Sequence, residues 1–185
     1  LPKFLSRLGA DVRVFMPFYR EVRAKNLALR PIIQRGTLDW TGKRLDYSVF
    51  EYRANGFSVY FIARDGYYDR DHLYGTPAGD YPDNGERFAF FSRASLDAMK
   101  TLGFSPDVVH GHDWQSAMAF AYLKFVYSDD PFFATTKSLF TVHNLAYQGL
   151  FGKEVSAPIG LSDDLFNMND LEFFGQVNFM KAGIL

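Results

Sequence analysis

The sequence predicts an α/β protein with a Rossmann-like parallel sheet, helices on both faces of that sheet and an inserted β-hairpin. Short apolar strands alternate with segments whose apolar residues recur at helical spacing. Residues 26–62 interrupt this alternation with strand patterns only. The apolar run at 139–142 ends abruptly at His143-Asn144. Polar residues directly after a buried strand are typical of the ligand-binding edge of an open parallel sheet.

Length and composition set the limits of the interpretation. The 185 residues suit one domain with a sizeable core, and a net charge of -1 gives no reason to expect nucleic acid or an anionic membrane surface as partner. The absence of cysteine excludes disulfides and thiolate zinc sites. No apolar run of about 18 residues occurs, so no transmembrane helix is expected. Neither terminus resembles a natural chain end, and we interpret the sequence as a fragment of a longer protein.

The amino-terminal elements follow from local patterns. Residues 1–8 predict a short helix with one buried apolar face, and Gly9 is its expected stop. Residues 11–16 predict a strand that ends at Pro17. Within 26–62, alternating apolar residues predict strands, and Asn55-Gly56 between two of them is a strong signal of a hairpin turn. This β-region is the predicted insertion.

The remaining elements are a loop, further helices and two strands. Residues 64–84 form a long polar loop, and Asp83 or Asn84 is the expected cap of a helix over 86–102. The apolar face predicted for this helix comprises Phe88, Phe91, Leu96 and Met99. Further along the chain, we predict strands at 106–110 and 138–142 and helices at 114–126, 161–166 and 174–185.

Two candidate site segments follow the two later strands. His110-Gly111-His112-Asp113-Trp114 lies at the end of the first, and His143-Asn144 at the end of the second. Parallel strands deliver their carboxyl ends to one edge of a sheet, so both segments are expected to open onto one crevice. Two alternatives stay open at this point. Asp113 also suits the cap of the following helix, and His143 also suits a hydrogen-bonded core histidine.

Other kinds of chemistry have weaker support in the sequence. His110 and His112 form a His-x-His pair that metal hydrolases use, but His72 and His143 lack the spacing of further ligands. There is no G-x-S-x-G serine, no Walker A loop and no G-x-G-x-x-G run. We therefore expect neither a metal nor a covalent nucleophile at this crevice.

Three stretches together resemble the amino-terminal domain of bacterial glycogen synthases and plant starch synthases. They are PDVVHGHDWQSAMAFAYL (106–123), LFTVHNLAYQGLF (139–151) and LEFFGQVNFMKAGIL (171–185). Residues 1–19 and 83–96 also fit, so that the resemblance covers essentially the whole chain in the order of the family. The second stretch is the most specific.

The resemblance implies an enzyme with two Rossmann-like domains, the arrangement called GT-B. Residues 1–185 are then a partial amino-terminal domain on the side of the glucan acceptor. The first strand with its Lys-x-Gly-Gly-Leu loop and the carboxyl-terminal nucleotide-sugar domain are absent. The implied reaction is the transfer of glucose from ADP-glucose or UDP-glucose to the non-reducing end of an α-1,4-glucan in glycogen or starch, with retention at the anomeric carbon. The resemblance implies no cofactor, and the fragment alone is expected to be inactive.

The resemblance also implies roles for individual residues. His143 matches the catalytic histidine beside the transferred glucose, where it stabilises positive charge on the sugar ring. Asp113 and Trp114 match an acceptor-side pair that binds sugar hydroxyls and an apolar sugar face. Tyr81 matches a tyrosine of the cleft, although Tyr81-Pro82-Asp83-Asn84 by itself indicates only a turn before a helix. Substrate-binding roles for Asn144 and Gln148 follow from the same motif as His143.

The expected partners are an α-glucan acceptor and a nucleotide-sugar donor, the latter bound mainly by the absent domain. The expected location is the cytoplasm of a bacterium, or a plastid if the protein comes from a plant. Two other functions remain open. One is a non-catalytic glucan-binding module, and the other is a metal-dependent hydrolase that uses His110 and His112.

Overall fold

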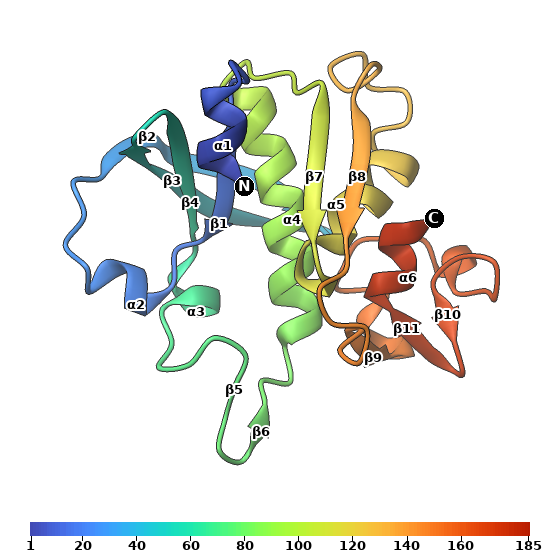
Figure 1. Cartoon of the computed structure of the whole chain (residues 1–185). Helices are drawn as coiled ribbons and strands as arrows, with labels where there is room; N and C mark the ends of the chain where they lie inside the picture. Colours follow the sequence, from blue (N-terminus) through green and yellow to red (C-terminus); the bar gives the residue numbers. More distant parts are fainter. The chain divides into compact units, whose positions relative to one another are not determined.

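The computed structural model describes residues 1–185, which form two compact units. Unit 1 comprises residues 1–38 and 44–81, and unit 2 comprises residues 39–43 and 82–185. Each unit contains a pair of parallel strands and several helices (Figure 1), which confirms the predicted α/β class. No helix of the chain combines the length and the apolar character needed to cross a membrane.

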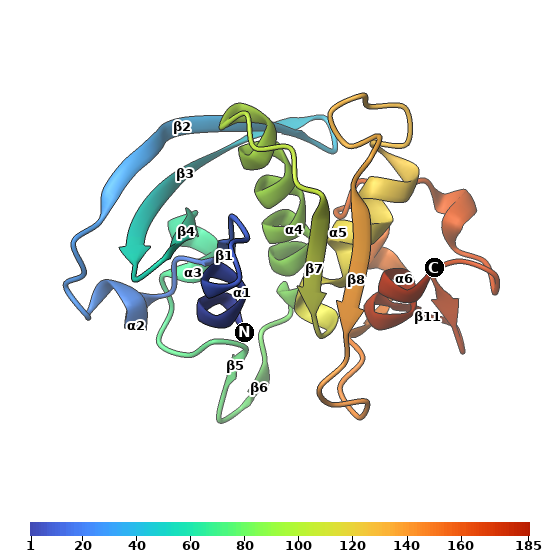
Figure 2. The same cartoon turned by 45° about the horizontal axis from the view of Figure 1, so that its top comes forward.

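A four-stranded mixed sheet organises unit 1. Its order is β1-β4-β3-β2, and the strands are β1 (Arg13–Pro17), β2 (Arg30–Trp40), β3 (Lys43–Ala54) and β4 (Phe57–Ala63). β1 runs parallel to β4, whereas β3 runs antiparallel to it. The long ribbon of β2 and β3 is seen in Figure 2. The rings of Phe50 and Phe61 lie 5.2 and 5.4 Å from Phe18, between centroids, and form part of the core of this unit.

The predicted Asn55-Gly56 turn is confirmed, but it does not connect two inserted strands. Ala54 pairs with Phe57, so that only Asn55 and Gly56 form the loop, and Gly56 has the positive φ of 93° that such turns require. The strand after the turn, β4, is the parallel partner of β1. The insertion in the α/β pattern is therefore the β2–β3 ribbon, and the Asn-Gly turn returns the chain to the parallel strands.

The first helix forms as predicted, but its predicted buried face is wrong. α1 (Pro2–Arg7) precedes Gly9, whose φ is 92°, and none of its residues is buried. Phe4 and Leu8 are 65% and 84% exposed. A helix of six residues offers little area for packing, and the hydrogen bond from its Ser6 hydroxyl to the Gly56 carbonyl holds a polar side chain against unit 1 instead.

The predicted loop at 64–84 contains only short elements. They are α3 (Asp65–Tyr68), β5 (Gly75–Thr76) and β6 (Gly79–Asp80), and the preceding α2 (Arg20–Arg23) is equally short. Arg20 anchors the loop, because its guanidinium donates to the Asp69 carboxylate at 2.8 Å and to the Asp69 carbonyl at 2.7 Å. Tyr68 is fully buried. These contacts give the loop a defined path without regular secondary structure.

Unit 2 places two parallel strands beside a helical core. β7 (Val108–His112) pairs with β8 (Lys137–Thr141), and the main helices are α4 (Asn84–Thr101), α5 (Trp114–Phe125) and α6 (Phe179–Ile184). The four residues predicted for the apolar face of α4 are all buried. The helix is buried almost all round, since it also encloses Arg87, whose guanidinium donates to the Asn84 side chain at 2.5 Å. Asp83 precedes the helix, but its side chain does not cap it.

The carboxyl-terminal part of unit 2 differs from its prediction. A small antiparallel sheet of order β10-β11-β9 is formed by β9 (Leu150–Gly152), β10 (Glu172–Phe173) and β11 (Gln176–Asn178). The helix predicted over 174–185 begins only at Phe179, because Phe174 and Gly175 have φ of 49° and 79° and form a tight turn. The predicted helix at 161–166 is a single 3-10 turn, η2 (Asp163–Leu165), and another such turn is η1 (Lys153–Val155).

A buried tyrosine ties α5 to the chain that follows β9. The Tyr122 hydroxyl donates to the Ile159 carbonyl at 2.6 Å, and both residues are fully buried. Burial raises the pKa of Tyr122, so the hydroxyl keeps its proton. Trp40 packs against the Tyr122 ring at 6.4 Å between centroids. One hydrogen bond thus satisfies a buried donor and a buried acceptor.

We expect Tyr122→Phe to lower the free energy of unfolding by about 1–2 kcal/mol, because the Ile159 carbonyl is left buried without its partner. Urea denaturation of the full-length protein measures this change. Tyr147→Phe is the matched control, since Tyr147 is 69% exposed. An equal stability of wild type and Tyr122→Phe contradicts the assignment.

Candidate functional site

The carboxyl ends of β7 and β8 lie side by side in unit 2. In the parallel register, His112 of β7 is the partner of Thr141 of β8. The residues that follow the two strands therefore emerge at the same edge. The structure brings Asp113 and His143 together there, and the side chain of His143 is exposed.

The Asp113 carboxylate joins the two strand ends. Its Oδ1 accepts a hydrogen bond from the backbone N–H of His143 at 2.7 Å, and its own backbone N–H donates to the Thr141 carbonyl at 2.9 Å. The interpretation of Asp113 as a side-chain cap of α5 is wrong, because no cap bond forms. The carboxylate points across to β8 and binds the orphan N–H of the neighbouring segment instead.

Asp113 has a strained backbone. Its φ of 56° and ψ of 177° lie in a region that is almost reserved for glycine and costs on the order of 1–3 kcal/mol for other residues. The Ser116 hydroxyl lies 3.1 Å from the Asp113 carbonyl and 2.9 Å from the His112 carbonyl, and it supports this corner. Gly111 allows the corner to be tight, since a Cβ added at this position would lie 2.6 Å from the Phe120 ring. Strain of this kind concentrates at functional sites.

Three imidazoles line this edge. His110 and His112 are two residues apart on β7 and share one face of the strand, with 4.2 Å between ring centroids. The His143 ring is nearly parallel to that of His112, at 5.3 Å and 21°. His110 Nε2 is 2.7 Å from Thr141 Oγ1, and His112 Nδ1 is 3.0 Å from His143 Nε2. The rings form a continuous polar stack.

The stack favours neutral imidazoles on β7. Burial lowers the pKa of His110, and positive charge on His143 lowers it further. Partial desolvation likewise lowers the pKa of His112, followed by the repulsion of His110 and His143. No group of three or more His, Asp or Glu side chains is arranged to hold a metal ion. The ring nitrogens that bind Thr141 and His143 are engaged within the protein, and the hydrolase alternative gains no support from this geometry.

Trp114 is packed into an aromatic cluster. Its indole makes edge contacts with Phe88 at 5.0 Å, Phe151 at 5.6 Å and Phe179 at 6.4 Å between centroids. Gly149 has φ of 66° and approaches the indole closely. A Cβ added to Gly149 would lie 2.6 Å from the Trp114 ring. The half-buried Trp114 therefore fixes the chain that follows the His143 loop, and its sugar-stacking role stays a prediction.

Asn144 and Gln148 shape the loop after β8. Asn144 Oδ1 accepts from the Ala146 N–H at 3.0 Å, which closes a tight turn. Gln148 donates to the Leu145 carbonyl at 3.2 Å, and its Oε1 accepts from the Asn178 amide at 2.7 Å. The loop is thereby held against the start of α6, and their predicted contacts with substrate remain predictions.

Tyr81 belongs to unit 1. Its backbone N–H donates to the Tyr74 carbonyl at 2.9 Å, and the Arg70 guanidinium lies 4.7 Å from the centre of its ring. The stacked arrangement holds the ring in place. Its role in the site stays a prediction.

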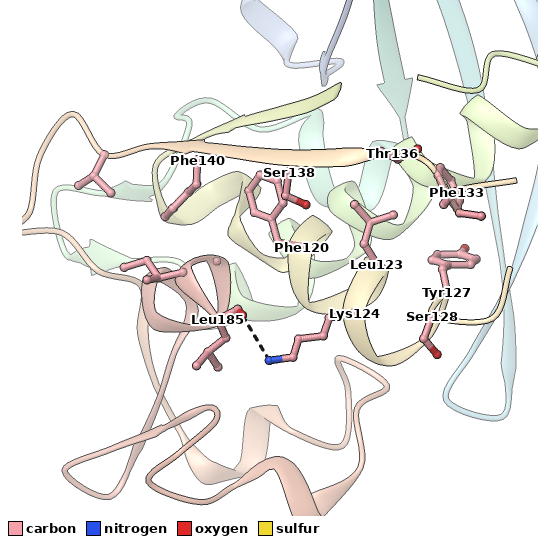
Figure 3. Close-up of a pocket in the computed structure, with 14 residues that line it drawn as sticks. Phe120, Leu123, Lys124, Tyr127, Ser128, Phe133, Thr136, Ser138, Phe140 and Leu185 are labelled. Atoms are coloured by element: carbon pink, nitrogen blue, oxygen red, sulfur yellow. Dashed lines mark hydrogen bonds between the residues drawn. The ribbon is translucent and has the colours of Figure 1, made fainter. Parts of the chain in front are cut away.

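A groove of about 610 Å³ lies elsewhere in unit 2, along β8, α5 and α6 (Figure 3). Phe120 and Phe140 contribute to its lining, and Lys124 donates to the Leu185 carbonyl at 3.3 Å across one side of it. None of the predicted site residues lines this groove. The groove and the predicted site residues therefore occupy different parts of unit 2.

Sequence reasoning missed what His112, Thr141 and Ser116 do. His112 had been considered only as a metal ligand, whereas it contacts His143 directly. A signal was present: residues two apart on a strand share a face, so His110 and His112 on one strand and Thr141 and His143 on the next suggest one row. The strand register needed to join the two rows is not written in the sequence.

Comparisons with known proteins agree on one family. The sequence profile described as starch synthase catalytic domain matches residues 1–185. The chain is 43% identical over 190 residues to the glycogen synthase of Syntrophotalea carbinolica and 45% identical over 185 residues to glycogen synthase 2 of Geobacter sulfurreducens. It covers 38% of each of these proteins, while all of this chain is matched.

Structural comparison gives the same result. The catalytic domain of starch synthase IV from Arabidopsis thaliana, bound to ADP and acarbose, matches 99% of this chain with a TM-score of 0.84 and 25% sequence identity, and the match covers 38% of that chain. The predicted Rossmann-like half of a GT-B enzyme is thus confirmed as the fold class. With its full length matched by the family profile, the chain belongs to the starch synthase catalytic domain family.

Proposed function

We propose that this chain is part of a retaining glucosyltransferase that adds glucose from ADP-glucose, or UDP-glucose, to the non-reducing end of an α-1,4-glucan. The observation that carries the proposal is the hydrogen bond between the Asp113 carboxylate and the His143 N–H at two paired strand ends. The names of the relatives support the reaction class. The Arabidopsis structure is bound to ADP, which supports an adenine nucleotide sugar as the donor.

His143 is the proposed catalytic residue. A sugar ring that loses its nucleotide develops positive charge, and an imidazole with an adjacent backbone carbonyl stabilises that charge mainly in the transition state. The side chain is exposed at the strand edge, where a glucose residue has access to it. The Asp113 bond fixes the backbone on which both groups are carried.

The acceptor glucan is proposed to bind around the same edge. Asp113 uses Oδ1 for the His143 N–H, which leaves Oδ2 for a sugar hydroxyl. Trp114 supplies aromatic surface there, and the amides of Asn144 and Gln148 supply polar groups of the kind that bind hydroxyls. A substrate-binding role for Tyr81 of unit 1 is proposed on the resemblance alone. Neither a metal nor another cofactor has a part in this proposal.

We propose that residues 1–185 form a partial amino-terminal domain, on the acceptor side, of a longer enzyme. The chain spans 38% of the relatives it matches, so the donor is proposed to bind mainly to the remainder. Without that remainder, the chain alone is proposed to be inactive. The bacterial relatives favour the bacterial cytoplasm over a plastid as its location.

We expect His143→Ala in the full-length protein to reduce glucose transfer at least about 100-fold, roughly 3 kcal/mol of barrier, because stabilisation of the sugar cation is lost. Incorporation of labelled glucose from ADP-glucose into glycogen measures the rate. His72→Ala is the control, since His72 is an exposed histidine of a loop in unit 1. Near-normal transfer by His143→Ala removes this residue from the mechanism, and glucan binding without any transfer by the wild type favours the non-catalytic module.

Asp113 is expected to respond differently to two substitutions. Asp113→Asn retains an oxygen acceptor and carries the same backbone strain as Asp, so the free energy of unfolding is expected to change by less than about 1 kcal/mol while transfer falls about 10-fold or more. Asp113→Ala loses the bond to the His143 N–H, and its free energy of unfolding is expected to fall by about 1–3 kcal/mol as well. Denaturation curves and transfer rates of both variants test this. Equal stability of the two variants contradicts the bridging role.

A further inference from the structure

We infer that His112 is a positioning residue for His143: its imidazole holds the His143 ring and dedicates one ring nitrogen of His143 to the protein. The inference rests on the proposed function of His143. It is carried by the 3.0 Å contact between His112 Nδ1 and His143 Nε2, together with the nearly parallel rings. His112 itself is not proposed to touch the substrate.

The two histidines sit on supports of different rigidity. His112 is the last residue of β7, inside the paired register, whereas His143 lies two residues beyond the end of β8 in an exposed loop. A loop side chain at that position has rotational freedom that must be removed before it acts on a substrate. The Asp113 carboxylate holds the backbone of His143, and His112 holds its ring. His143 is thus fixed at two points, one on its backbone and one on its side chain.

The contact also determines the chemistry of the His143 ring. A neutral imidazole has one N–H donor and one acceptor nitrogen, and a bond between two imidazoles needs one of each. His143 Nε2 is committed to His112, so Nδ1 is the nitrogen left for a ligand. In a neutral His143 ring, Nδ1 is a donor when Nε2 is an acceptor, and an acceptor when Nε2 is a donor. His112 therefore decides whether the ligand meets a donor or an acceptor.

His112 is braced for this purpose. On one side its ring packs against His110 at 4.2 Å between centroids, and His110 is in turn bonded to the Thr141 hydroxyl. The His112 carbonyl accepts from the Ser116 hydroxyl at 2.9 Å. The lowered pKa of His112 supports a neutral ring, in which Nδ1 takes one of the two roles, donor or acceptor, toward His143 Nε2. The contacts from His110 through His112 thus connect the His143 ring, which lies in the loop, to the paired strands.

Substitution of His112 separates positioning from simple packing. The side chain is exposed, so replacement is expected to change stability little. Asparagine places an amide close to where Nδ1 of histidine lies and retains a hydrogen-bond partner for His143 Nε2. Leucine has a similar bulk but no polar atom. The pair His112→Asn and His112→Leu therefore differs mainly in the one interaction under test.

The experiment uses the full-length protein with both variants. We expect His112→Leu to reduce kcat for glucose transfer about 10- to 100-fold with little change in KM for ADP-glucose, and His112→Asn to stay within about 3-fold of wild type. Nitrogen NMR of histidine-labelled protein gives a readout apart from activity. The His143 ring is expected to show one fixed tautomer in wild type and His112→Asn, and an average of two tautomers in His112→Leu.

Two results overturn the inference. One is an unchanged His143 tautomer in His112→Leu with normal kcat, and the other is an equal loss of kcat in both variants, which indicates packing alone. The NMR readout keeps this test apart from that of the proposed function. If the wild type transfers no glucose, the proposed function fails, while the tautomer in His112→Leu still decides whether His112 orders the ring.

Discussion

The site depends on one charged hydrogen bond, from the backbone N–H of His143 to the carboxylate of Asp113. Without it, the backbone of His143 loses its bond to the chain leaving β7, because the paired register of the strands ends at His112 and Thr141, and the ring contact with His112 remains. A bond to a charged group is worth about 1.5–3 kcal/mol, which is comparable to the cost of the strained Asp113 backbone. The two terms offset each other, so the strained corner persists only while it holds the loop.

The sequence was informative wherever a local pattern determines structure. Alternating residues located the strands, Asn55-Gly56 located a turn, and the polar residues after two apolar runs located the edge at which β7 and β8 end. It was uninformative wherever tertiary contacts decide. Asp113 directly before a helix has the pattern of a cap, but the carboxylate binds His143 because the neighbouring strand presents an N–H at that point. Only the strand register reveals that N–H.

Local sequence patterns did not predict how much of α1 and of Trp114 is buried. The apolar face of α1 is exposed, and the indole of Trp114 is packed against other rings. The apolar spacing of residues 1–8 correctly predicted a helix, yet a buried face requires a partner surface that the pattern does not specify. The sugar-stacking role of Trp114 stays a prediction, and its local sequence did not show that Phe88, Phe151 and Phe179 from three separate elements pack against the indole. Burial is a property of the assembled fold, and local periodicity states only which side chains would benefit from it.

The His110–His112 pair shows that residue type and spacing alone do not determine what two side chains contact. Two histidines at this spacing suggest metal ligands, but the same spacing places both rings on one face of β7, where they pack against each other. The pair then extends to His143 through a ring-to-ring hydrogen bond. A stack of this kind holds a residue beyond the end of a strand in a geometry set by the strand. The sheet thus orders the loop in two ways at His143. The His112 ring holds its side chain, and the Asp113 carboxylate holds its backbone.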